Sequence, residues 1–268
     1  MTKTILITGA TDGIGLATAK NLVAKGHTLL IHGRNTDKLA AVKAQLLALT
    51  TEDVNESNVQ TYVADLSILS EVKALANSIK AEHTSLDVLI NNAGVYKTSN
   101  PITPEGLDVR FSVNTIAPFI LTQQLAPLLE KSGRVVNLSS AAQAPVNIDA
   151  LLGKTQLAAM EAYAQSKLAL TMLSRDMANQ YKETGPVVFS VNPGSLLASK
   201  MVKKGFGIEG KDLSIGANIL VKSALSDEFS EATGLYFDND IGQFSAPHQD
   251  ALDVQKTAKL TEAIKSIV

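Results

Sequence analysis

The sequence predicts an α/β protein with a doubly wound, seven-stranded parallel sheet flanked by helices, in a single domain that spans residues 1–268. Short β-branched and aliphatic runs alternate with helical patterns, and this alternation requires crossover connections between parallel strands. The runs are continuously apolar, as is typical of strands buried on both faces. No Pro/Gly/Ser-rich linker or charge block divides the chain. We therefore expect one folding unit.

Seven runs are the expected strands, and most of them lead into a polar or glycine-rich segment. They are Thr4–Ile7, Thr28–His32, Val59–Val63, Leu86–Ile90, Arg134–Leu138, Val187–Val191 and Gly234–Phe237. The helix expected between the second and third runs has aliphatic residues on one face, at Leu39, Val42, Leu46 and Leu49. Its candidate N-cap is Thr36 or Asp37. In such sheets ligands bind beyond the carboxyl ends of the strands, so the residues after each run are the candidates for function.

The composition argues against several kinds of partner. Lys and Arg number 24 against 26 Asp and Glu, giving a formal charge of −2, so neither nucleic acid nor an anionic membrane is expected to bind. Cysteine is absent, which excludes disulfides and thiolate chemistry and fits a reducing compartment. We expect a cytoplasmic protein.

Two further patterns support a soluble protein without a metal centre. The N-terminus enters a strand-like run without the charged leader and apolar stretch of a signal peptide. The most apolar later window, Ile116–Leu129, is interrupted by Pro118 and Pro127 and is too short to span a bilayer. The four histidines are scattered, at His27, His32, His83 and His248. No metal is therefore expected.

A glycine-rich turn follows the first expected strand. It holds Gly9, Thr11, Asp12, Gly13, Ile14 and Gly15. Glycine lets the backbone approach a pyrophosphate closely, and the N-terminus of the following helix presents N–H groups to it. A simple strand-to-helix turn is the alternative interpretation, because one such turn is weak evidence.

The spacing G-x-x-x-G-x-G occurs in an ordered series with NNAG, VNTIAP, VNLSS and AYAQSK. In this series the chain resembles the short-chain dehydrogenase/reductase family over nearly its full length. The resemblance implies a Rossmann fold, a nicotinamide cofactor and a small carbonyl or alcohol substrate. It also implies a homodimer or homotetramer, formed through helices that flank the edge strands.

Tyr163 and Lys167 are the candidate catalytic pair. Residues four apart on a helix share a face, so the spacing brings a phenol and an ammonium together. Reduction of a carbonyl requires a hydride and a proton, and without a metal the proton must come from a side chain. A tyrosine titrates near pH 10 unless a neighbouring cation lowers its pKa, and Lys167 is placed to do so.

The resemblance implies further roles at this site. Lys167 is expected to hydrogen-bond the nicotinamide ribose, which makes both it and Tyr163 cofactor contacts. Ser140, the second serine of VNLSS, is expected to bind the substrate oxygen, with Ser139 as the alternative. Asn114 matches the asparagine through which a water links the lysine to bulk solvent.

The segment after the second strand favours NADP(H), with NAD(H) possible. It reads His32, Gly33, Arg34, Asn35, with no acid at the strand end to bind a ribose 2′-hydroxyl. Arg34 can accommodate a 2′-phosphate, and Asn35 is expected beside it. The alternatives are an ordinary solvated arginine at position 34 and a ribose contact from Asp37.

Three more segments complete the expected cofactor site. By resemblance, Asp65 and Leu66 lie against the adenine, although Asp65 also suits a helix N-cap. Asn92, Ala93 and Gly94 are expected to tie loops together and leave room for the cofactor. Pro193 and Gly194 resemble the turn on the nicotinamide side. The family usually has a threonine soon after that turn, and here Ser195 or Ser199 replaces it.

Two segments are expected on the substrate side. Tyr163 lies 23 residues after Ser140, a long separation that resembles the retinol-dehydrogenase-like members of the family. The extra residues, Gln143–Met160, either wall a substrate pocket or form a surface excursion. Within 195–213, the glycine-containing stretch Lys200–Asp212 is either a mobile lid or a disordered loop.

The sequence is compatible with two functions. The first is an NADP(H)-dependent alcohol dehydrogenase or carbonyl reductase with a hydrophobic substrate, as the apolar insert suggests. The second is a non-catalytic nucleotide-sensing or scaffold protein with the same fold. A sensor needs the glycines and not the phenol, so the intact Ser140, Tyr163 and Lys167 favour the enzyme.

Overall fold

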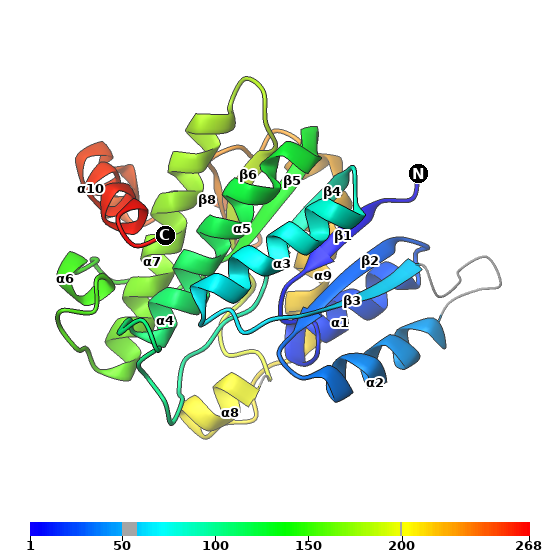
Figure 1. Cartoon of the computed structure of the whole chain (residues 1–268), viewed down its shortest axis with the longest axis horizontal. Coiled ribbons are helices and arrows are strands. Elements are labelled where there is room, and N and C mark those ends of the chain that lie inside the picture. Colours follow the sequence, from blue (N-terminus) through cyan, green and yellow to red (C-terminus); the bar gives the residue numbers. More distant parts are fainter. Residues whose placement is uncertain (50–57, 199) are drawn as a thin grey trace.

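A twisted eight-stranded sheet runs through the protein in the computed structural model, which describes residues 1–49, 58–198 and 200–268 (Figure 1). The strand order is β3-β2-β1-β4-β5-β6-β7-β8. The strands are β1 (Thr4–Ile7), β2 (Thr28–Gly33), β3 (Val59–Val63), β4 (Leu86–Asn91), β5 (Leu129–Leu138), β6 (Val187–Asn192), β7 (Tyr236–Asp238) and β8 (Gln243–Ser245). The first seven are parallel, which confirms the predicted doubly wound fold.

The expected number of strands is wrong by one. Strand β8 pairs antiparallel with β7, with Phe237 opposite Phe244, and forms the edge of the sheet. It has only three residues, one of them apolar, so its sequence lacks a recognisable strand pattern. Its aromatic packing is tertiary: Phe244 lies 5.1 Å from Phe237 and 5.2 Å from Phe229 between ring centroids.

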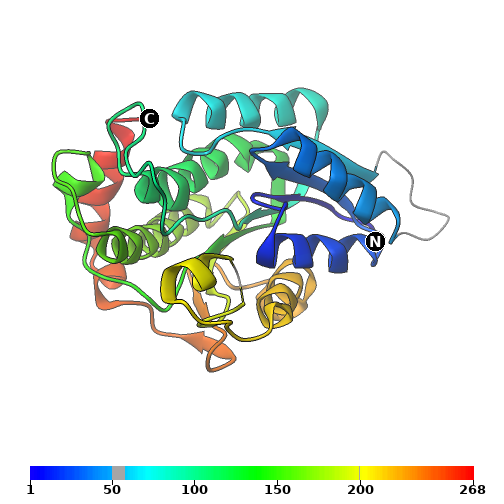
Figure 2. The same ribbon diagram turned by 90° about the horizontal axis from the view of Figure 1, so that it is seen from below.

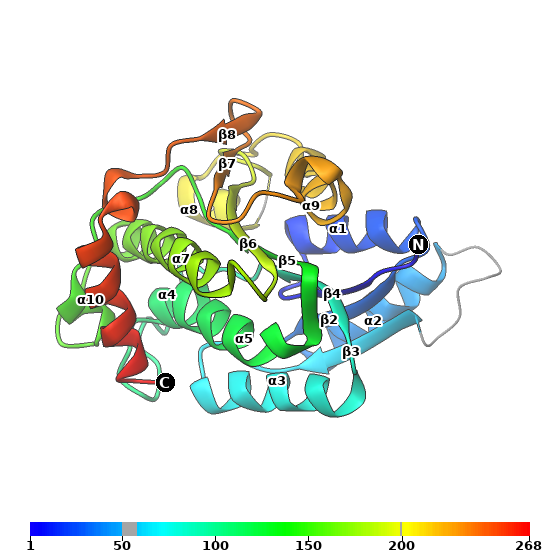
Figure 3. The same cartoon turned by 90° about the horizontal axis from the view of Figure 1, so that it is seen from above.

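Helices cover both faces of the sheet (Figures 2 and 3). They are α1 (Gly13–Val23), α2 (Thr36–Leu47), α3 (Leu69–Glu82), α4 (Val109–Phe111), α5 (Ala117–Leu125), α6 (Ile148–Leu151), α7 (Ala159–Tyr181), α8 (Lys200–Phe206), α9 (Leu213–Leu225) and α10 (Val254–Lys265). One buried cluster joins α3, α5 and α7 to the sheet, and a second joins α1, α2 and α9 to the opposite face. The continuous apolar runs of the strands are buried because both faces are covered.

Helix α2 differs in detail from its expectation. Leu39, Val42 and Leu46 are buried as the spacing predicts, whereas Leu49 lies beyond the helix and is 48% exposed. The N-cap is neither Thr36 nor Asp37. Asn35 takes that position, because its side-chain oxygen accepts a hydrogen bond from the Lys38 N–H.

Part of the insert 143–160 packs onto the domain core, and about half of its residues are exposed. Ala150 and Leu151 of α6 are buried with α7 and α10 in the first cluster. Gly153 lies against the backbone of the loop before α4, since a Cβ there would be 2.3 Å from the Gly106 carbonyl oxygen. None of its residues lines the cleft described below, and a contact of the insert with substrate stays a prediction.

Within the described residues, no helix combines the length and apolar character that crossing a membrane requires.

Candidate active site

A cleft of about 960 Å³ opens at the carboxyl edge of the parallel strands. Segments that follow β1, β2, β3, β4, β5 and β6 line it, together with α7 and α8. It contains most of the predicted site: Gly9, Thr11, Asp12, Gly13, Ile14, Gly15, Arg34, Asp65, Leu66, Asn92, Ala93, Gly94, Tyr163, Lys167 and Pro193. Residues that are far apart in sequence converge because parallel strands end at the same edge.

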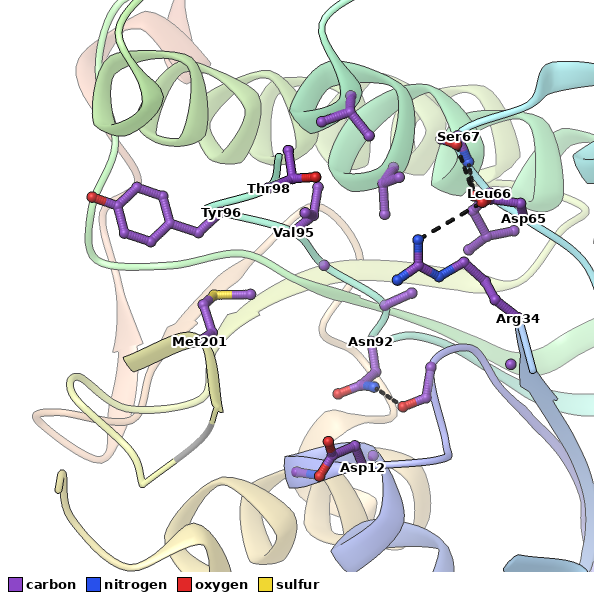
Figure 4. Close-up of a pocket in the computed structure, with 18 of the residues that line it drawn as sticks. Asp12, Arg34, Asp65, Leu66, Ser67, Asn92, Val95, Tyr96, Thr98 and Met201 are labelled. Carbon is purple, nitrogen blue, oxygen red and sulfur yellow. Dashed lines mark hydrogen bonds and ion pairs between the residues drawn. The ribbon is translucent and has the colours of Figure 1, made fainter. Parts of the chain in front are cut away.

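The glycine turn is tied to the end of β4 by Asn92. The Asn92 amide donates to the carbonyls of Thr8 (2.8 Å) and Gly9 (3.1 Å), and the bond to Gly9 is drawn in Figure 4. The Thr8 hydroxyl accepts from the N–H groups of Asn92 and Ala93. Gly15 cannot carry a side chain, because a Cβ would lie 2.4 Å from the Gly9 carbonyl oxygen. These contacts hold the turn and the first turn of α1 against the sheet.

Asp12 caps the N-terminus of α1. Its carboxylate accepts a hydrogen bond of 2.8 Å from the Gly13 N–H. The helix therefore begins at the cleft with its N–H groups directed toward it, as a pyrophosphate site requires.

Arg34 extends into the opening of the cleft from the end of β2. Its side chain is 71% exposed, and its guanidinium lies 3.7 Å from the Asp65 carboxylate (Figure 4). So exposed an ion pair holds the arginine only weakly, and the guanidinium stays available to another anion. The preceding Gly33 leaves room for Thr11 of the glycine turn, since a Cβ would be 2.6 Å from Thr11 Cγ2.

Lys38 also lines the cleft, and the sequence interpretation missed it. It lies four residues after Arg34, in the first turn of α2, and this position close to the end of β2 could have identified it. Asp37 lies in the same first turn and is not among the lining residues. Asn35 does not line the cleft either. A cofactor contact from it stays a prediction.

His32 is a second missed residue. Its Nδ1 accepts from the Gly9 N–H at 3.2 Å, and its Nε2 lies 3.0 Å from the Ala64 carbonyl oxygen. Burial lowers the pKa of His32 to about 4, so the ring is neutral at physiological pH. The imidazole thus connects the glycine turn to the end of β3. A histidine at a strand end gave no sequence signal for this role.

Asp65 forms a turn with Ser67 and does not cap a helix. Its carboxylate accepts hydrogen bonds from the Ser67 N–H and hydroxyl at 2.9 and 2.8 Å. Helix α3 begins later, at Leu69, whose N–H donates to Glu105. Leu66 is buried at the cleft wall.

Helix α7 presents Tyr163 and Lys167 at the cleft. Lys167 Nζ donates to the Leu138 carbonyl at 2.6 Å and lies 5.8 Å from the centre of the Tyr163 ring. Gly94 faces the same point: a Cβ there would lie 3.7 Å from Lys167 Nζ, 3.6 Å from Asn114 Oδ1 and 3.7 Å from Met201 Cε. The lysine, the asparagine and helix α8 therefore meet around one glycine.

The pKa values at this point differ from the expectation. Burial raises the pKa of the Tyr163 phenol, and a hydrogen bond with the Ser140 side chain opposes the rise. Burial also lowers the pKa of Lys167 to about 8. The expected lowering of the Tyr163 pKa by Lys167 is not observed in the protein alone, because burial, the Ser140 hydrogen bond and the neighbouring Tyr96 determine the shift.

The two serines after β5 point to different surroundings. Ser139 is buried, and its hydroxyl bonds with Thr171 Oγ1 at 2.7 Å and with the Lys167 carbonyl at 3.1 Å. Ser140 is partly exposed and interacts with Tyr163. Its carbonyl accepts from Gln143 (2.8 Å) and from the Tyr236 hydroxyl (3.2 Å). Ser140 is thus the serine beside the phenol, whereas Ser139 is the serine that lines the cleft.

Asn114 lies in a π-helical turn, Ser112–Ile116, between α4 and α5. Its amide accepts from the Val95 N–H (2.8 Å) and donates to the Val95 carbonyl (3.0 Å) and the Ser166 hydroxyl (2.9 Å). Such turns interrupt helices at functional sites, and this one sets Asn114 against the strand end. The π turn itself had no sequence signal.

The turn after β6 is fixed from the β7–β8 connection. Asp240 accepts hydrogen bonds from the Ser195 N–H and hydroxyl and from the Asn192 amide. Pro193 lines the cleft, whereas Gly194 packs near Ile215 and Leu197. The Ser195 hydroxyl is therefore committed to Asp240. Its expected alternative, Ser199, lies outside the described residues.

Sequence comparison places these features in a family. The model of short-chain dehydrogenases matches residues 3–206. The chain belongs to the short-chain dehydrogenase family. Retinol dehydrogenase 12 of Mus musculus is 32% identical over 247 residues, covering 88% of this chain and 77% of that protein. Human retinol dehydrogenase 13 is 30% identical over 95% of this chain and 81% of its own length. Human polyprenol dehydrogenase is 31% identical, covering 88% of this chain and 76% of itself.

Solved structures agree with this assignment. A short-chain dehydrogenase from Shigella flexneri complexed with NADP has a TM-score of 0.69 and 28% identity, covering 88% of this chain and 96% of that one. One from Burkholderia cenocepacia, also with NADP, has a TM-score of 0.70 and 25% identity, covering 90% and 97%. A Mycobacterium paratuberculosis protein at 24% identity shares the fold with a TM-score of 0.79, covering 98% and 92%.

The predicted family and its retinol-dehydrogenase-like character are thus confirmed. The protein is a nicotinamide-dependent oxidoreductase that acts on alcohols or carbonyls. Its cleft fits such a cofactor, because Gly9 and Gly15 keep the backbone of the turn closely packed where α1 presents its N-terminus. In the described ranges no group of three His, Asp or Glu side chains is arranged to hold a metal.

Proposed function

We propose that the protein is an NADP(H)-dependent alcohol dehydrogenase or carbonyl reductase for a hydrophobic substrate, with Tyr163 as its acid/base. The observation that carries the proposal is the meeting of Tyr163 and Lys167 at one wall of the cleft, beside Gly94, with the Ser140 side chain hydrogen-bonded to the phenol. The nicotinamide cofactor supplies or accepts the hydride.

Each side chain has a role in this proposal. Tyr163 gives a proton to the substrate oxygen during reduction and takes it back during oxidation. Ser140 holds that oxygen by a hydrogen bond, and its partial exposure and contact with the phenol support this assignment over Ser139. Lys167 binds the ribose and, when protonated, lowers the pKa of the phenol. Asn114 anchors the lysine side of the site and the water that relays its proton.

The preference for NADP(H) rests on two basic side chains at the opening of the cleft. Arg34 and Lys38 both line the cleft, and Arg34 is held only by a weak ion pair at 3.7 Å. A guanidinium binds phosphate oxygens through paired, charge-assisted hydrogen bonds. The Shigella flexneri and Burkholderia cenocepacia relatives were solved with NADP, in agreement with this preference.

The substrate class is inferred from relatives and from the cleft wall. Relatives named for retinol and polyprenol act on long apolar alcohols, and Val95, Tyr96 and Met201 line this cleft near Lys167. We further propose cytoplasmic localisation and a homodimer or homotetramer. A monomer in light scattering at micromolar concentration contradicts the oligomer.

A non-catalytic sensor is the second candidate, and a cofactor-dependent turnover assay decides between the two. Retinal, aliphatic aldehydes and ketones of increasing length are tested with NADPH and NADH, and the corresponding alcohols with the oxidised cofactors. Consumption of NADPH by the parent and its loss in Tyr163→Phe support the enzyme. Tight NADPH binding without turnover of any of these substrates supports the sensor.

A further inference from the structure

Tyr96 occupies a position between the catalytic tyrosine and helix α8. Its ring centre lies 5.3 Å from that of Tyr163, with 57° between the ring planes. On its other side is Gly205 of α8: a Cβ there would lie 2.7 Å from Tyr96 Cε1 and 2.8 Å from Cδ1. The ring thus packs against Tyr163 on one side and leaves no room for a side chain at Gly205 on the other, so it cannot move without disturbing one neighbour or the other.

The backbone of Tyr96 is held in place by a buried ion pair. Arg110 Nε donates to the Tyr96 carbonyl at 2.8 Å, and Arg110 Nη1 donates to Asp108 at 2.6 Å. Both charged side chains are at least nine-tenths buried. A buried ion pair seldom stabilises a fold by much, but it fixes the groups it contacts. The backbone of Tyr96 is therefore fixed, and a disturbance of the contact between Tyr96 and Gly205 should displace α8.

Helix α8 is attached at its base and rests on Tyr96. At the base, the Lys211 N–H donates to the Leu196 carbonyl (2.7 Å) and the Ala198 N–H donates to the Lys211 carbonyl (2.6 Å). Away from the base, Lys97 Nζ donates to the Gly205 carbonyl at 3.1 Å. Figure 4 shows Met201 of α8 reaching toward the cleft near Tyr96. The helix thus covers the point where Lys167 and Asn114 meet.

We propose that Tyr96 is a positioning residue, whose ring transmits the position of α8 to Tyr163. When Gly205 rests on the ring, Tyr96 is confined between α8 and the phenol, and Tyr163 keeps one orientation. A substrate that lifts α8 frees the ring, so productive geometry requires α8 to close again over the bound substrate. The proposal rests on the proposed function only for the acid/base role of Tyr163.

Four variants test the contact. Gly205→Ala places a methyl group against the ring and should displace α8. Tyr96→Leu removes the ring, and Tyr96→Phe is its matched control because it keeps the ring and removes only the hydroxyl. The fourth is the double variant Tyr96→Leu/Gly205→Ala. A coupled pair is non-additive, so Gly205→Ala should have little further effect once the ring is gone.

The first measurement needs no catalysis. Lys203 is an exposed trypsin site within α8, and cleavage there requires the helix to open. Mass spectrometry follows cleavage after Lys203 in the full chain. Gly205→Ala should be cut at least about fivefold faster than the parent. The double variant should be cut less than about twofold faster than Tyr96→Leu. Equal acceleration in both backgrounds, or none in the parent background, overturns the proposal.

The second measurement separates positioning from simple destabilisation. Gly205→Ala and Tyr96→Leu should each lower kcat by about tenfold or more through a misplaced phenol, with the NADPH Kd within about twofold of the parent. Tyr96→Phe keeps the ring and should therefore lower kcat much less than Tyr96→Leu does. A loss of kcat in Tyr96→Phe as large as that in Tyr96→Leu, or a parallel loss of NADPH binding, overturns the positioning role. Full activity of Tyr163→Phe would instead overturn the proposed function and leave the trypsin result standing.

Discussion

The two ends of the cleft hold their charged groups in contrasting ways. At the end of β2, Arg34 is 71% exposed and its ion pair with Asp65 spans 3.7 Å. At the end of β5, Lys167 is 4% exposed and donates to a backbone carbonyl at 2.6 Å. Interactions between exposed charges are weakened by water and salt, whereas enclosed groups have no solvent to replace a lost partner. The exposed end should therefore tolerate substitution and tune affinity, while the enclosed end should respond to single changes with large losses.

The largest effect is expected at the enclosed end. Tyr163→Phe deletes one oxygen and keeps the ring that packs on Tyr96, so the fold and cofactor binding should survive. The proton donor is lost, and turnover should fall about 10²- to 10⁴-fold. Stopped-flow hydride transfer and a fluorescence titration of NADPH measure the two properties. Hydride transfer within about tenfold of the parent would place the acid elsewhere.

Lys167→Ala should affect two properties together. It removes the cation beside the phenol and the expected ribose ligand, so kcat and NADPH affinity should both decrease, whereas Tyr163→Phe changes kcat alone. The same two measurements distinguish the variants. An unchanged NADPH Kd in Lys167→Ala would show that the lysine serves the phenol and not the cofactor.

The sequence predicted most of the exposed and glycine-built end because its requirements are local. Gly15 must be a glycine because the Gly9 carbonyl lies too close for a side chain, and the glycine spacing predicts this turn. Arg34 lines the cleft because it directly follows a strand, and its position in the sequence was enough to predict this. The features that the sequence did not indicate depend on tertiary packing. The π turn around Asn114, the Ser195–Asp240 contact and strand β8 join segments whose spacing carries no periodic signal.

The sequence indicated that His32 lies at the end of a strand, but it did not indicate the two hydrogen bonds that the ring makes. The stability of the protein in acid tests these hydrogen bonds. The folded pKa is about 4 and the ordinary value is 6.5, so the neutral ring contributes stability above pH 6.5 that is lost as the pH falls toward 4. The loss should be on the order of 3 kcal/mol, because burial disfavours the charged imidazole and its protonated Nδ1 can no longer accept from the Gly9 N–H.

Urea unfolding at pH 7.5 and 4.5 measures this loss. His32→Gln is the control, because its amide can still donate and accept without titrating. Its stability should fall less between the two pH values than that of the parent. Equal losses would assign the acid sensitivity to carboxylates elsewhere and not to the link between β1 and β3.

At the exposed end the expected effect is smaller. NADPH should bind at least about tenfold more tightly than NADH, equivalent to about 1.4 kcal/mol, through Arg34. Arg34→Ala should remove most of that difference and leave NADH affinity unchanged, so NADH is the internal control. Lys38→Ala should weaken NADPH binding to a lesser degree, and raised salt should reduce both effects. Equal affinity of the parent for both cofactors would contradict the assignment.

The smallest effect concerns Leu196, which lies at the base of α8 and is the one non-glycine residue with positive φ (57°) within the described ranges. A left-handed leucine costs about 1–2 kcal/mol relative to its ordinary backbone, and its side chain is 43% exposed, so little packing offsets the cost. Leu196→Gly relieves the strain but gives the unfolded chain more freedom, worth about 0.5–1 kcal/mol. The variant should therefore be neutral or up to about 1 kcal/mol more stable than the parent.

Leu235→Gly is the matched control, because Leu235 is 41% exposed and has an ordinary φ. This substitution should only destabilise the protein. Urea unfolding compares the two, and an equal loss in both would show that the backbone at Leu196 stores no strain for α8 to release.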